Sequence, residues 1–288
     1  MRAFMLVPVS KQGITPTART VVPIWARTSP VVDVSNVLGR LPPTKLRANP
    51  RPVCAMSTAS SGLHVLDGDE AGAMARISAA RVSCKAFLDK PVDKQILESI
   101  LQVTQRAPTS FNTQPYRLVV VSSKEAKEAL AATMMETNKA KVLAAGATVV
   151  VLADLQVDGN KTSELTKAAA PQMSGYADMI PSLLPIFAGS KGKNTVAEWA
   201  FKNAGLVGMR LLDAATAHGL ATAILEGIDS EQAMLEAIHA PASRYRVPFV
   251  ICIGHPDIEA ESARLDKFAS QQTPRFSLDD IVSYDSLN

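Results

Sequence analysis

The sequence has few cysteines and histidines and no long apolar run. Three cysteines occur in 288 residues (Cys54, Cys84 and Cys252), and no two form a C-x-x-C pair, so a disulfide-stapled secreted module is excluded. The four histidines are scattered without the H-E-x-x-H spacing of a zinc enzyme, so no metal site is predicted. The longest apolar stretches are short runs such as 147–153, far below the roughly 20 residues of a membrane helix. We therefore expect a soluble, folded protein.

Charge is distributed unevenly along the chain. Residues 1–57 hold eight basic side chains and one acid, Asp33 (net +7), whereas the other 231 residues hold 22 basic and 26 acidic side chains (net −4). An Arg-rich, acid-poor segment rich in Ser, Thr and Pro is typical of an organelle transit peptide; an unstructured extension is the alternative. Val53-Cys54-Ala55 resembles a stromal cleavage region, which favours a chloroplast over a mitochondrion. The acidic remainder has no Lys/Arg cluster, so neither nucleic acid nor an anionic membrane is an expected partner.

The chain is expected to comprise a transit peptide (1–57), a linker (58–75) and one folded domain (76–288). Helices are predicted over 70–80, 93–106, from Ser122 to about Asn138, over 196–218 and from Asp229; strands are predicted over 117–121, 147–153, 221–225 and 247–253. Asp93 is placed to cap its helix, Ser122-x-x-Glu125 forms a capping box, and Gly219 is a helix stop. Short strands among long helices predict a single layered domain of class α+β.

Residues 156–195 interrupt this order of elements. The segment is rich in Gly, Pro and Lys and lies between a strand and the longest helix. A loop of this length is usually a lid or a binding element; a disordered insertion is the alternative. Gly189-Ser-Lys-Gly-Lys within it lacks the spacing of a phosphate-binding loop, so no nucleotide site is predicted there.

Two segments carry polar side chains suited to a ligand. Arg81-Val82-Ser83-Cys84-Lys85 places two cations and a hydroxyl where they can converge on a phosphate, although a solvated basic turn has the same pattern. Ala107-Pro-Thr-Ser-Phe-Asn-Thr-Gln-Pro-Tyr116 is rich in amides and hydroxyls. Asn112 and Gln114 can bond the edge of a planar heterocycle, or they can serve an ordinary turn.

Together these segments resemble the FMN-dependent nitroreductase family. R-x-S-x-K-x-F is followed about thirty residues later by P-x-S-x-N-x-Q-P-Y. Asn138 and Lys141 precede the valine-rich strand as the family's second amide and lysine do. Ala223-Ile-Leu-Glu-Gly-Ile-Asp229 is similar to the family's P-I-E-G-F-D turn, and Thr273-Pro-Arg275 to its C-terminal arginine motif. The similarity spans about residues 76–282 in the family's order.

The resemblance implies non-covalent binding of FMN in an intertwined homodimer, with a central, mostly antiparallel sheet flanked by helices. It assigns Arg81, Ser83 and Arg275 to the phosphate, and Lys85, Asn138 and Lys141 to the pyrimidine edge. It also places the backbone of Glu226-Gly227 at flavin N5, with Gly227 leaving room for the ring. Residues Pro108 to Asn112 would come from the partner subunit. The whole predicted cofactor-binding set is Arg81, Val82, Ser83, Lys85, Pro108, Thr109, Ser110, Asn112, Asn138, Lys141, Leu225, Glu226, Gly227 and Arg275.

The function that the resemblance implies is reduction of nitroaromatics, quinones or similar electron-poor compounds by NADH or NADPH, in a ping-pong, two-electron cycle. The flavin would carry the chemistry, so no catalytic side chain is predicted. Tyr176 and Phe187 are candidates to cover the pocket, or they pack in the interior. Alternatives are another flavin reaction (dehalogenation, enoate reduction or flavin fragmentation) and a non-catalytic flavin-binding protein. Five residues depart from the family's usual pattern: Val82, Tyr116, Leu225, Ile228 and Thr273.

Overall fold

The computed structural model describes residues 68–189, 194–268 and 273–287. The chain divides into two units, Met1–Ala55 and Met56–Asn288, and all of the described residues belong to the second. The predicted transit peptide and residues 58–67 of the predicted linker lie outside the described residues. Helix α1 (Glu70–Ala80) has the bounds that the sequence predicted, and its first turns fall within the range 58–75.

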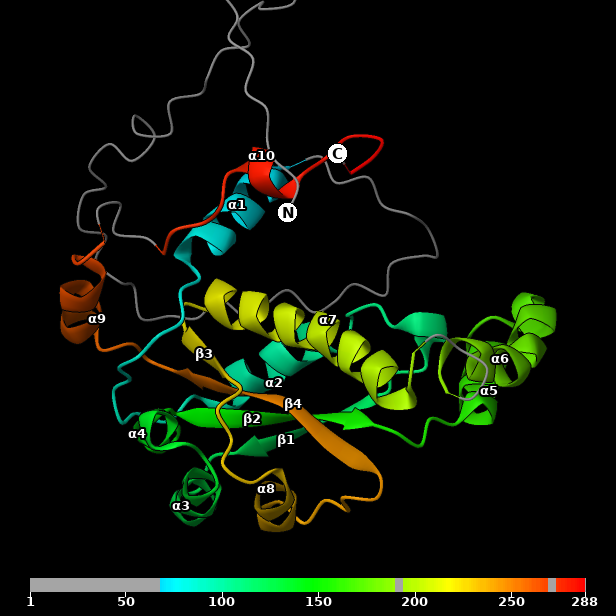
Figure 1. Ribbon diagram of the computed structural model, residues 1–288, viewed down its shortest axis with the longest axis horizontal. Helices are drawn as coiled ribbons and strands as arrows, with labels where there is room; N and C mark the ends of the chain where they lie inside the picture. The colour runs from blue at the N-terminus through cyan, green and yellow to red at the C-terminus, as the bar shows by residue number, and fades with distance from the viewer. Residues whose placement is uncertain (1–67, 190–193, 269–272, 288) are drawn as a thin grey trace, which may run out of the picture. The chain divides into compact units, whose positions relative to one another are not determined.

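A four-stranded antiparallel sheet forms the centre of the second unit (Figure 1). Its strands are β1 (Tyr116–Val121), β2 (Ala147–Asp154), β3 (Ala221–Leu225) and β4 (Tyr245–Gly254), in the order β1-β2-β4-β3. Every residue of β2 is buried because β2 is a central strand with helices over both of its faces. The predicted α+β class and mostly antiparallel sheet are confirmed.

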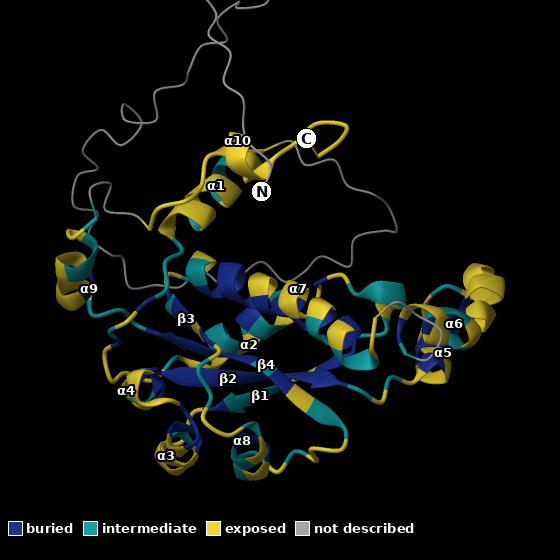
Figure 2. Ribbon diagram, in the orientation of Figure 1, coloured by how far each residue is buried: buried dark blue, intermediate teal, exposed yellow. Residues whose placement is uncertain are grey.

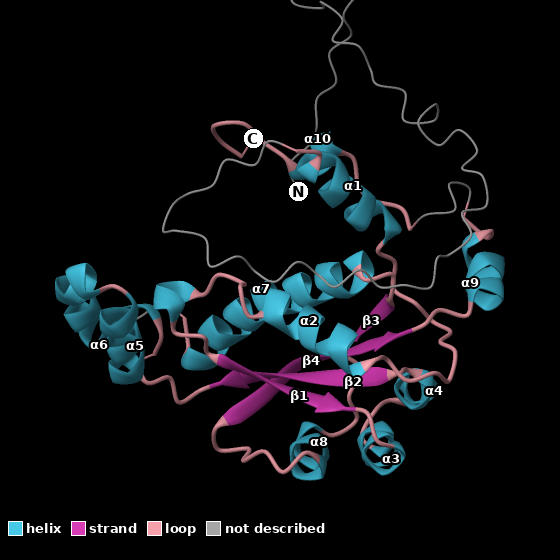
Figure 3. Cartoon of the chain, turned by 180° about the vertical axis from the view of Figure 1, so that it is seen from behind, coloured by secondary structure: helices cyan, strands magenta, loops and turns pink. Residues whose placement is uncertain are grey.

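Helices cover both faces of the sheet (Figures 1 and 3). On one face, α2 (Lys94–Thr104) and α7 (Val196–Ala217) pack against Val149 and Val151. On the other face, α3 (Lys124–Ala132), α4 (Glu136–Ala144) and α8 (Glu231–Ala237) pack against Val150 and Leu152. This alternation follows the two-residue period of a strand. Figure 2 shows the buried residues concentrated in β2, β4 and the sheet-facing side of α7.

Two predicted helix ends are confirmed, and one prediction is wrong. Asp93 caps α2 by accepting from the N–H groups of Gln95 and Ile96 at 2.8 and 3.2 Å. Gly219 follows α7 with φ +74°, a conformation that favours glycine. The helix predicted from Ser122 to Asn138 is instead two helices.

The break between α3 and α4 has a tertiary cause. Ser123, rather than Ser122, caps α3 by accepting from Ala126 N at 3.2 Å. After α3 ends at Ala132, Met134 pairs with Ile228 and Met135 N donates to Gly227 O at 3.1 Å. Pairing with the segment after β3 therefore interrupts a sequence that is locally helical.

The described part of 156–195 is helical. It forms α5 (Gly159–Ala169), a short 3₁₀ turn (Pro171–Met173) and α6 (Ser174–Phe187). The two helices pack closely: a Cβ added at Gly159 would lie 2.9 Å from Pro181 Cα. The presence of two packed helices favours a binding element over a disordered insertion. Two further helices follow β4: α9 (Ile258–Leu265) and α10 (Leu278–Ile281).

Candidate functional site

The Arg-x-Ser-x-Lys segment lies along the outer edge of β3. Ser83 forms a parallel bridge with Thr222, and Cys84 N donates to Thr222 O at 2.9 Å. Arg81, Val82 and Ser83 are half-buried, whereas Lys85 is exposed. The segment therefore extends the sheet by one short pairing, which fixes where its cations stand.

Helix α9 holds this segment in place through one buried carboxylate. Glu261 Oε1 accepts from the backbone N–H groups of Lys85 and Ala86 at 2.7 and 2.9 Å. Its Oε2 accepts from Arg264 Nη2 at 2.8 Å, and Arg264 Nη2 also lies 3.4 Å from Ser83 O. Sequence reasoning missed Glu261, since it lies 176 residues from Lys85 and no local pattern marks the contact.

A second group of predicted residues meets at the end of β3. Asn138 Nδ2 donates to Gly227 O at 3.1 Å, and Lys141 Nζ donates to Asn138 Oδ1 at 2.8 Å. Partial burial, together with the positive charge of Lys85, lowers the pKa of Lys141. Lys85 and Lys141 are therefore close enough to repel each other, and an anion bound between them would relieve that repulsion.

Gly227 has a packing role that the sequence did not predict, while its role beside the flavin ring stays a prediction. A Cβ at this position would lie 2.6 Å from Asn138 Nδ2 and 3.1 Å from Met135 Sδ. The glycine thus makes room for the amide of Asn138 within its own chain. Leu225 is buried as the last residue of β3, and Glu226 after it is exposed.

Two buried oxygens border Arg81–Ser83 without a hydrogen-bond partner among the described residues. They are Thr222 Oγ1, in the strand that pairs with Ser83, and Asp213 Oδ1 on α7. Burial raises the pKa of Asp213, while the positive charges of Arg210 and Arg81 act in the opposite direction. Arg81 is therefore within the field of a buried carboxyl group.

The amide-rich loop lies between α2 and β1 and is held by a residue that the sequence did not single out. Ser110 N donates to Asn203 Oδ1 at 2.8 Å, and buried Asn203 also donates to Trp199 O on its own helix, α7. Thr109 Oγ1 accepts from Gln114 N at 3.1 Å. Exposed Pro108 precedes these residues.

The backbone of this loop is strained. Phe111, Asn112 and Gln114 have φ of +54°, +54° and +49°, in the left-handed region that residues other than glycine seldom adopt. Strained backbone held by surrounding hydrogen bonds is frequent at binding sites.

Helix α6 brings two aromatic side chains to this loop. The rings of Phe111 and Phe187 are 5.2 Å apart in an edge-to-face arrangement. Tyr176 lines a cavity of about 410 Å³ together with Asn112 and Met173. Both residues named as candidates to cover a pocket thus lie beside the amide-rich loop.

The two parts of the predicted site are separated within one chain. The amide-rich loop enters β1 at Tyr116, which pairs with Ala153 of β2, and Ala153 pairs with Arg246 of β4. At the other edge of the sheet, Ser83 pairs with Thr222 of β3, and Thr222 pairs with Ile253 of β4. Arg246 and Ile253 are seven positions apart on an extended strand, a displacement of roughly 20 Å along the strand at about 3.3 Å per residue. The two parts therefore lie at opposite ends of the sheet.

Arg275 lies in an exposed segment. Its Nη1 donates to the carbonyl groups of Thr273 and Pro274, within its own turn. Its assignment to the phosphate stays a prediction. In the part of the chain that the structure describes, no helix has the length and apolarity of a membrane span, and no three His, Cys, Asp or Glu side chains gather as metal ligands.

Comparison with known proteins assigns the family. Residues 79–255 match the Nitroreductase family. The chain belongs to this family. A protein of Burkholderia lata, provisionally named NADH dehydrogenase/NAD(P)H nitroreductase, is 32% identical over 197 residues, which cover 68% of this chain and 88% of the relative. As a family member, the chain is an NAD(P)H-dependent oxidoreductase.

Solved structures share the fold of this nitroreductase-family chain. A provisionally named nitroreductase of Bacillus subtilis superposes with a TM-score of 0.63 at 22% identity, covering 74% of this chain and 99% of that one. Another from Exiguobacterium sibiricum, solved in complex with FMN, gives 0.60 at 22% identity, covering 74% and 97%. At this identity the likeness establishes the fold.

Proposed function

We propose that the chain binds FMN non-covalently and uses NADH or NADPH to reduce nitroaromatics, quinones or similar small electron-poor compounds in a two-electron, ping-pong cycle. The observation that carries this proposal is the hydrogen-bonded series from Gly227 through Asn138 to Lys141, with Lys85 beside it. When bound, FMN supplies the hydride chemistry. The side chains of this protein bind and orient it.

The available donors fit the chemistry of FMN. Arg81, Ser83 and Thr222, whose hydroxyl has no hydrogen-bond partner within the described ranges, form a set of donors suited to a phosphate. Lys85 and Lys141 supply positive charge for the electron-rich pyrimidine edge, where negative charge develops on reduction. Asn138 holds the Lys141 ammonium by a hydrogen bond, which keeps this charge in a fixed place.

We propose further that a second copy of the chain completes the site. Within one chain, the amide-rich loop (Pro108 to Asn112) enters the sheet roughly 20 Å along the strand direction from the cations at the edge of β3, by the rise of about 3.3 Å per strand residue. In a two-fold symmetric dimer, the loop of each protomer can cover the flavin of the other. This arrangement agrees with two features of the loop: Asn203 holds it in place through Ser110 N, and Asn112 is nevertheless exposed.

The absorbance spectrum of the purified full chain, before and after NADPH is added without oxygen, tests this proposal. We expect oxidised flavin bands that bleach in one step and return when menadione or nitrofurazone is added. A colourless protein contradicts flavin binding. A yellow protein that neither NADH nor NADPH bleaches contradicts the reductase activity and favours a flavin-binding protein without turnover. Turnover with a halophenol or an enoate alone would assign another flavin reaction.

We also propose that residues 1–57 direct the protein to an organelle, with the chloroplast favoured over the mitochondrion. The support is their net charge of +7 with a single acidic residue. A fusion of residues 1–57 to a fluorescent protein, expressed in plant cells, should accumulate in chloroplasts. Fluorescence in mitochondria would contradict the preference for the chloroplast, and fluorescence confined to the cytosol would contradict organelle targeting itself.

A further inference from the structure

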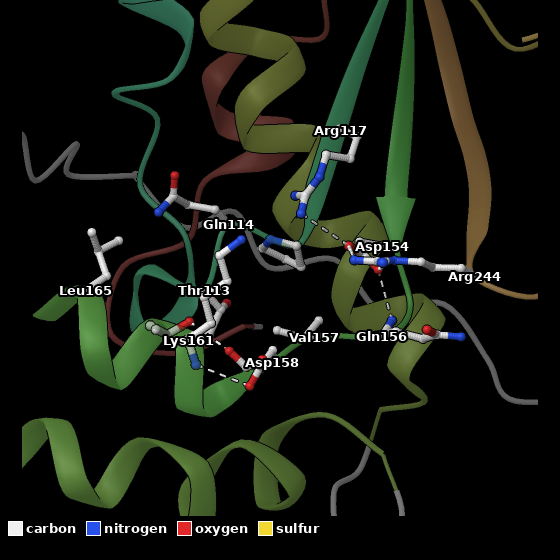
Figure 4. Close-up of a pocket in the computed structure, with 12 residues that line it drawn as sticks. Thr113, Gln114, Arg117, Asp154, Gln156, Val157, Asp158, Lys161, Leu165 and Arg244 are labelled. Atoms are coloured by element: carbon white, nitrogen blue, oxygen red, sulfur yellow. Dashed lines mark hydrogen bonds and ion pairs between the residues drawn. The ribbon is translucent and has the colours of Figure 1, made fainter. Parts of the chain in front are cut away.

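A cavity of about 690 Å³ opens between the start of β1 and helix α5 (Figure 4). Its volume is within the range of about 300–1,000 Å³ that is usual for small-molecule sites. Arg117 comes from β1, Lys161 from α5 and Arg244 from the turn before β4. Apart from two acidic residues, the rest of the wall mixes polar side chains such as Gln114 with apolar ones such as Leu165.

Both acidic residues in the wall are already engaged. Buried Asp154 accepts from Arg244 Nε and Nη2 at 2.9 and 2.8 Å, and from Gln156 N at 3.0 Å. Asp158 caps α5 by accepting from the N–H groups of Asn160 and Lys161 at 2.9 and 3.2 Å. The bidentate pair neutralises Arg244, which leaves it a structural role.

Two cations in the wall keep unused donors. Arg117 Nη2 forms a long ion pair with Asp154 Oδ2, at 3.8 Å, which is too far for a hydrogen bond. Among the described residues, only its Nη1 donates, to Tyr116 O at 2.7 Å. Lys161 makes no hydrogen bond or ion pair through its ammonium within the described ranges. With three cations and two acids in the wall, an anion is the ligand that this cavity favours.

The position of the cavity indicates which anion. The loop that carries Asn112 continues through Thr113 and Gln114 into this wall, and Leu165 belongs both to this cavity and to the one lined by Tyr176. A ligand with a flat ring at Asn112 can therefore extend its charged part toward Arg117 and Lys161. A pyridine nucleotide has this form.

We propose that Arg117 and Lys161 bind a phosphate group of the pyridine nucleotide that donates the hydride. This inference rests on the proposed function, since it assigns the donor's charged half. Two groups of the donor have the required chemistry: the pyrophosphate, common to NADH and NADPH, and the 2′-phosphate, present in NADPH alone.

Binding of nucleotide fragments tests the inference without turnover. The FMN-loaded full chain is titrated calorimetrically with 2′,5′-ADP, 5′-ADP and adenosine. We expect one or both phosphorylated fragments to bind more tightly than adenosine, and Arg117→Gln and Lys161→Gln each to weaken that binding about tenfold, the scale of one charge-assisted contact. Lys94→Gln, which removes an 88% exposed lysine from α2, is the matched control and should change nothing.

Steady-state kinetics separate the two sources of phosphate. If KM rises in the variants for NADPH alone, the 2′-phosphate occupies the cavity; if it rises for both nucleotides, the pyrophosphate does. Unchanged KM for both, or fragment binding that the variants do not affect, overturns the inference while leaving the reductase intact. A chain that oxidises neither nucleotide would contradict the proposed function itself, which is a distinct outcome.

Discussion

At the residue scale, the close approach of Asn138 to Gly227 explains why a glycine follows Glu226 in the turn after β3. The amide of Asn138 occupies the space that any larger residue at 227 would need, with 2.6 Å between Nδ2 and the position of an added Cβ. The same amide holds Lys141 through its oxygen. One contact therefore links the turn after β3 to a cation of the proposed flavin site.

Gly227→Ala should displace Asn138 and with it the Lys141 ammonium. We expect the dissociation constant for FMN to rise about tenfold, equivalent to about 1.4 kcal/mol, together with a lower Tm. Fluorescence titration and thermal unfolding measure the two effects. Gly175→Ala is the control, because nothing lies within 4 Å of a Cβ there. Equal behaviour of the two variants would show that the contact has no such role.

The two described cysteines should be unreactive in the folded protein. Burial and the charge of Glu261 raise the pKa of the Cys84 thiol to about 11, and burial raises that of Cys252 to about 12. At pH 8 only about 0.1% or less of each thiol is ionised, and the thiolate is the reactive form. In a Cys54→Ser background, a thiol reagent should label the native protein far more slowly than the denatured one.

The raised pKa values of the two thiols make the free energy of unfolding depend on pH. An unfolded thiol ionises near pH 9, below the pKa values of about 11 and about 12 in the folded protein. The stability that the protonated thiols contribute is therefore complete below pH 9 and is lost as the pH rises toward the folded pKa values. The free energy of unfolding, measured in denaturant, should therefore fall above pH 9. Rapid native labelling at pH 8 would contradict the assignment of Cys84 as a packed, inert residue.

At the element scale, helix α9 serves the Arg-x-Ser-x-Lys segment rather than the central core. Its Glu261 is buried and accepts from two backbone N–H groups of that segment. Arg264, three residues later, balances the charge of Glu261. Helix α9 therefore positions the backbone of Lys85, a residue of the proposed flavin site.

Glu261→Gln should loosen this segment. Loss of the charge weakens two hydrogen bonds and leaves Arg264 without its acidic partner, a cost of about 1–3 kcal/mol. We expect weaker FMN binding and faster hydrogen exchange at Lys85 and Ala86. Glu259→Gln, an exposed change on the same helix, should leave both unaffected. Unchanged hydrogen exchange at these two amides in the Glu261→Gln variant would argue against the role of Glu261 in holding this segment.

Local signals predicted most elements, and long-range pairing set the rest. Asp93, Gly219 and the run of β-branched residues in β2 act on their neighbours, so the sequence predicted them correctly. The break before Met134 depends on pairing with Ile228, far along the chain, and no local pattern contains it. In the candidate site, the motif residues could be found from the family resemblance. The hydrogen bond from Ser110 N to Asn203 could not be predicted, because only the fold brings these distant residues together.

At the scale of the whole molecule, the two parts of the proposed site lie at opposite ends of one sheet. Arg81 and its neighbours border β3, and the amide-rich loop enters β1. A dimer that brings the loop of one protomer to the cations of the other would unite them. Each site would then need one intact segment from each chain.

Subunit complementation measures this central claim most directly. Arg81→Ala removes a cation from one part, and Asn112→Gly removes the amide from the other while tolerating φ of +54°. We expect each variant alone to lose most of its FMN and its NADPH oxidation. Mixed dimers, obtained by co-expression with two affinity tags, should recover about half of the wild-type FMN, because one of the two sites is then intact. Mixed dimers as empty as their parents would contradict a shared site and place it within a single chain.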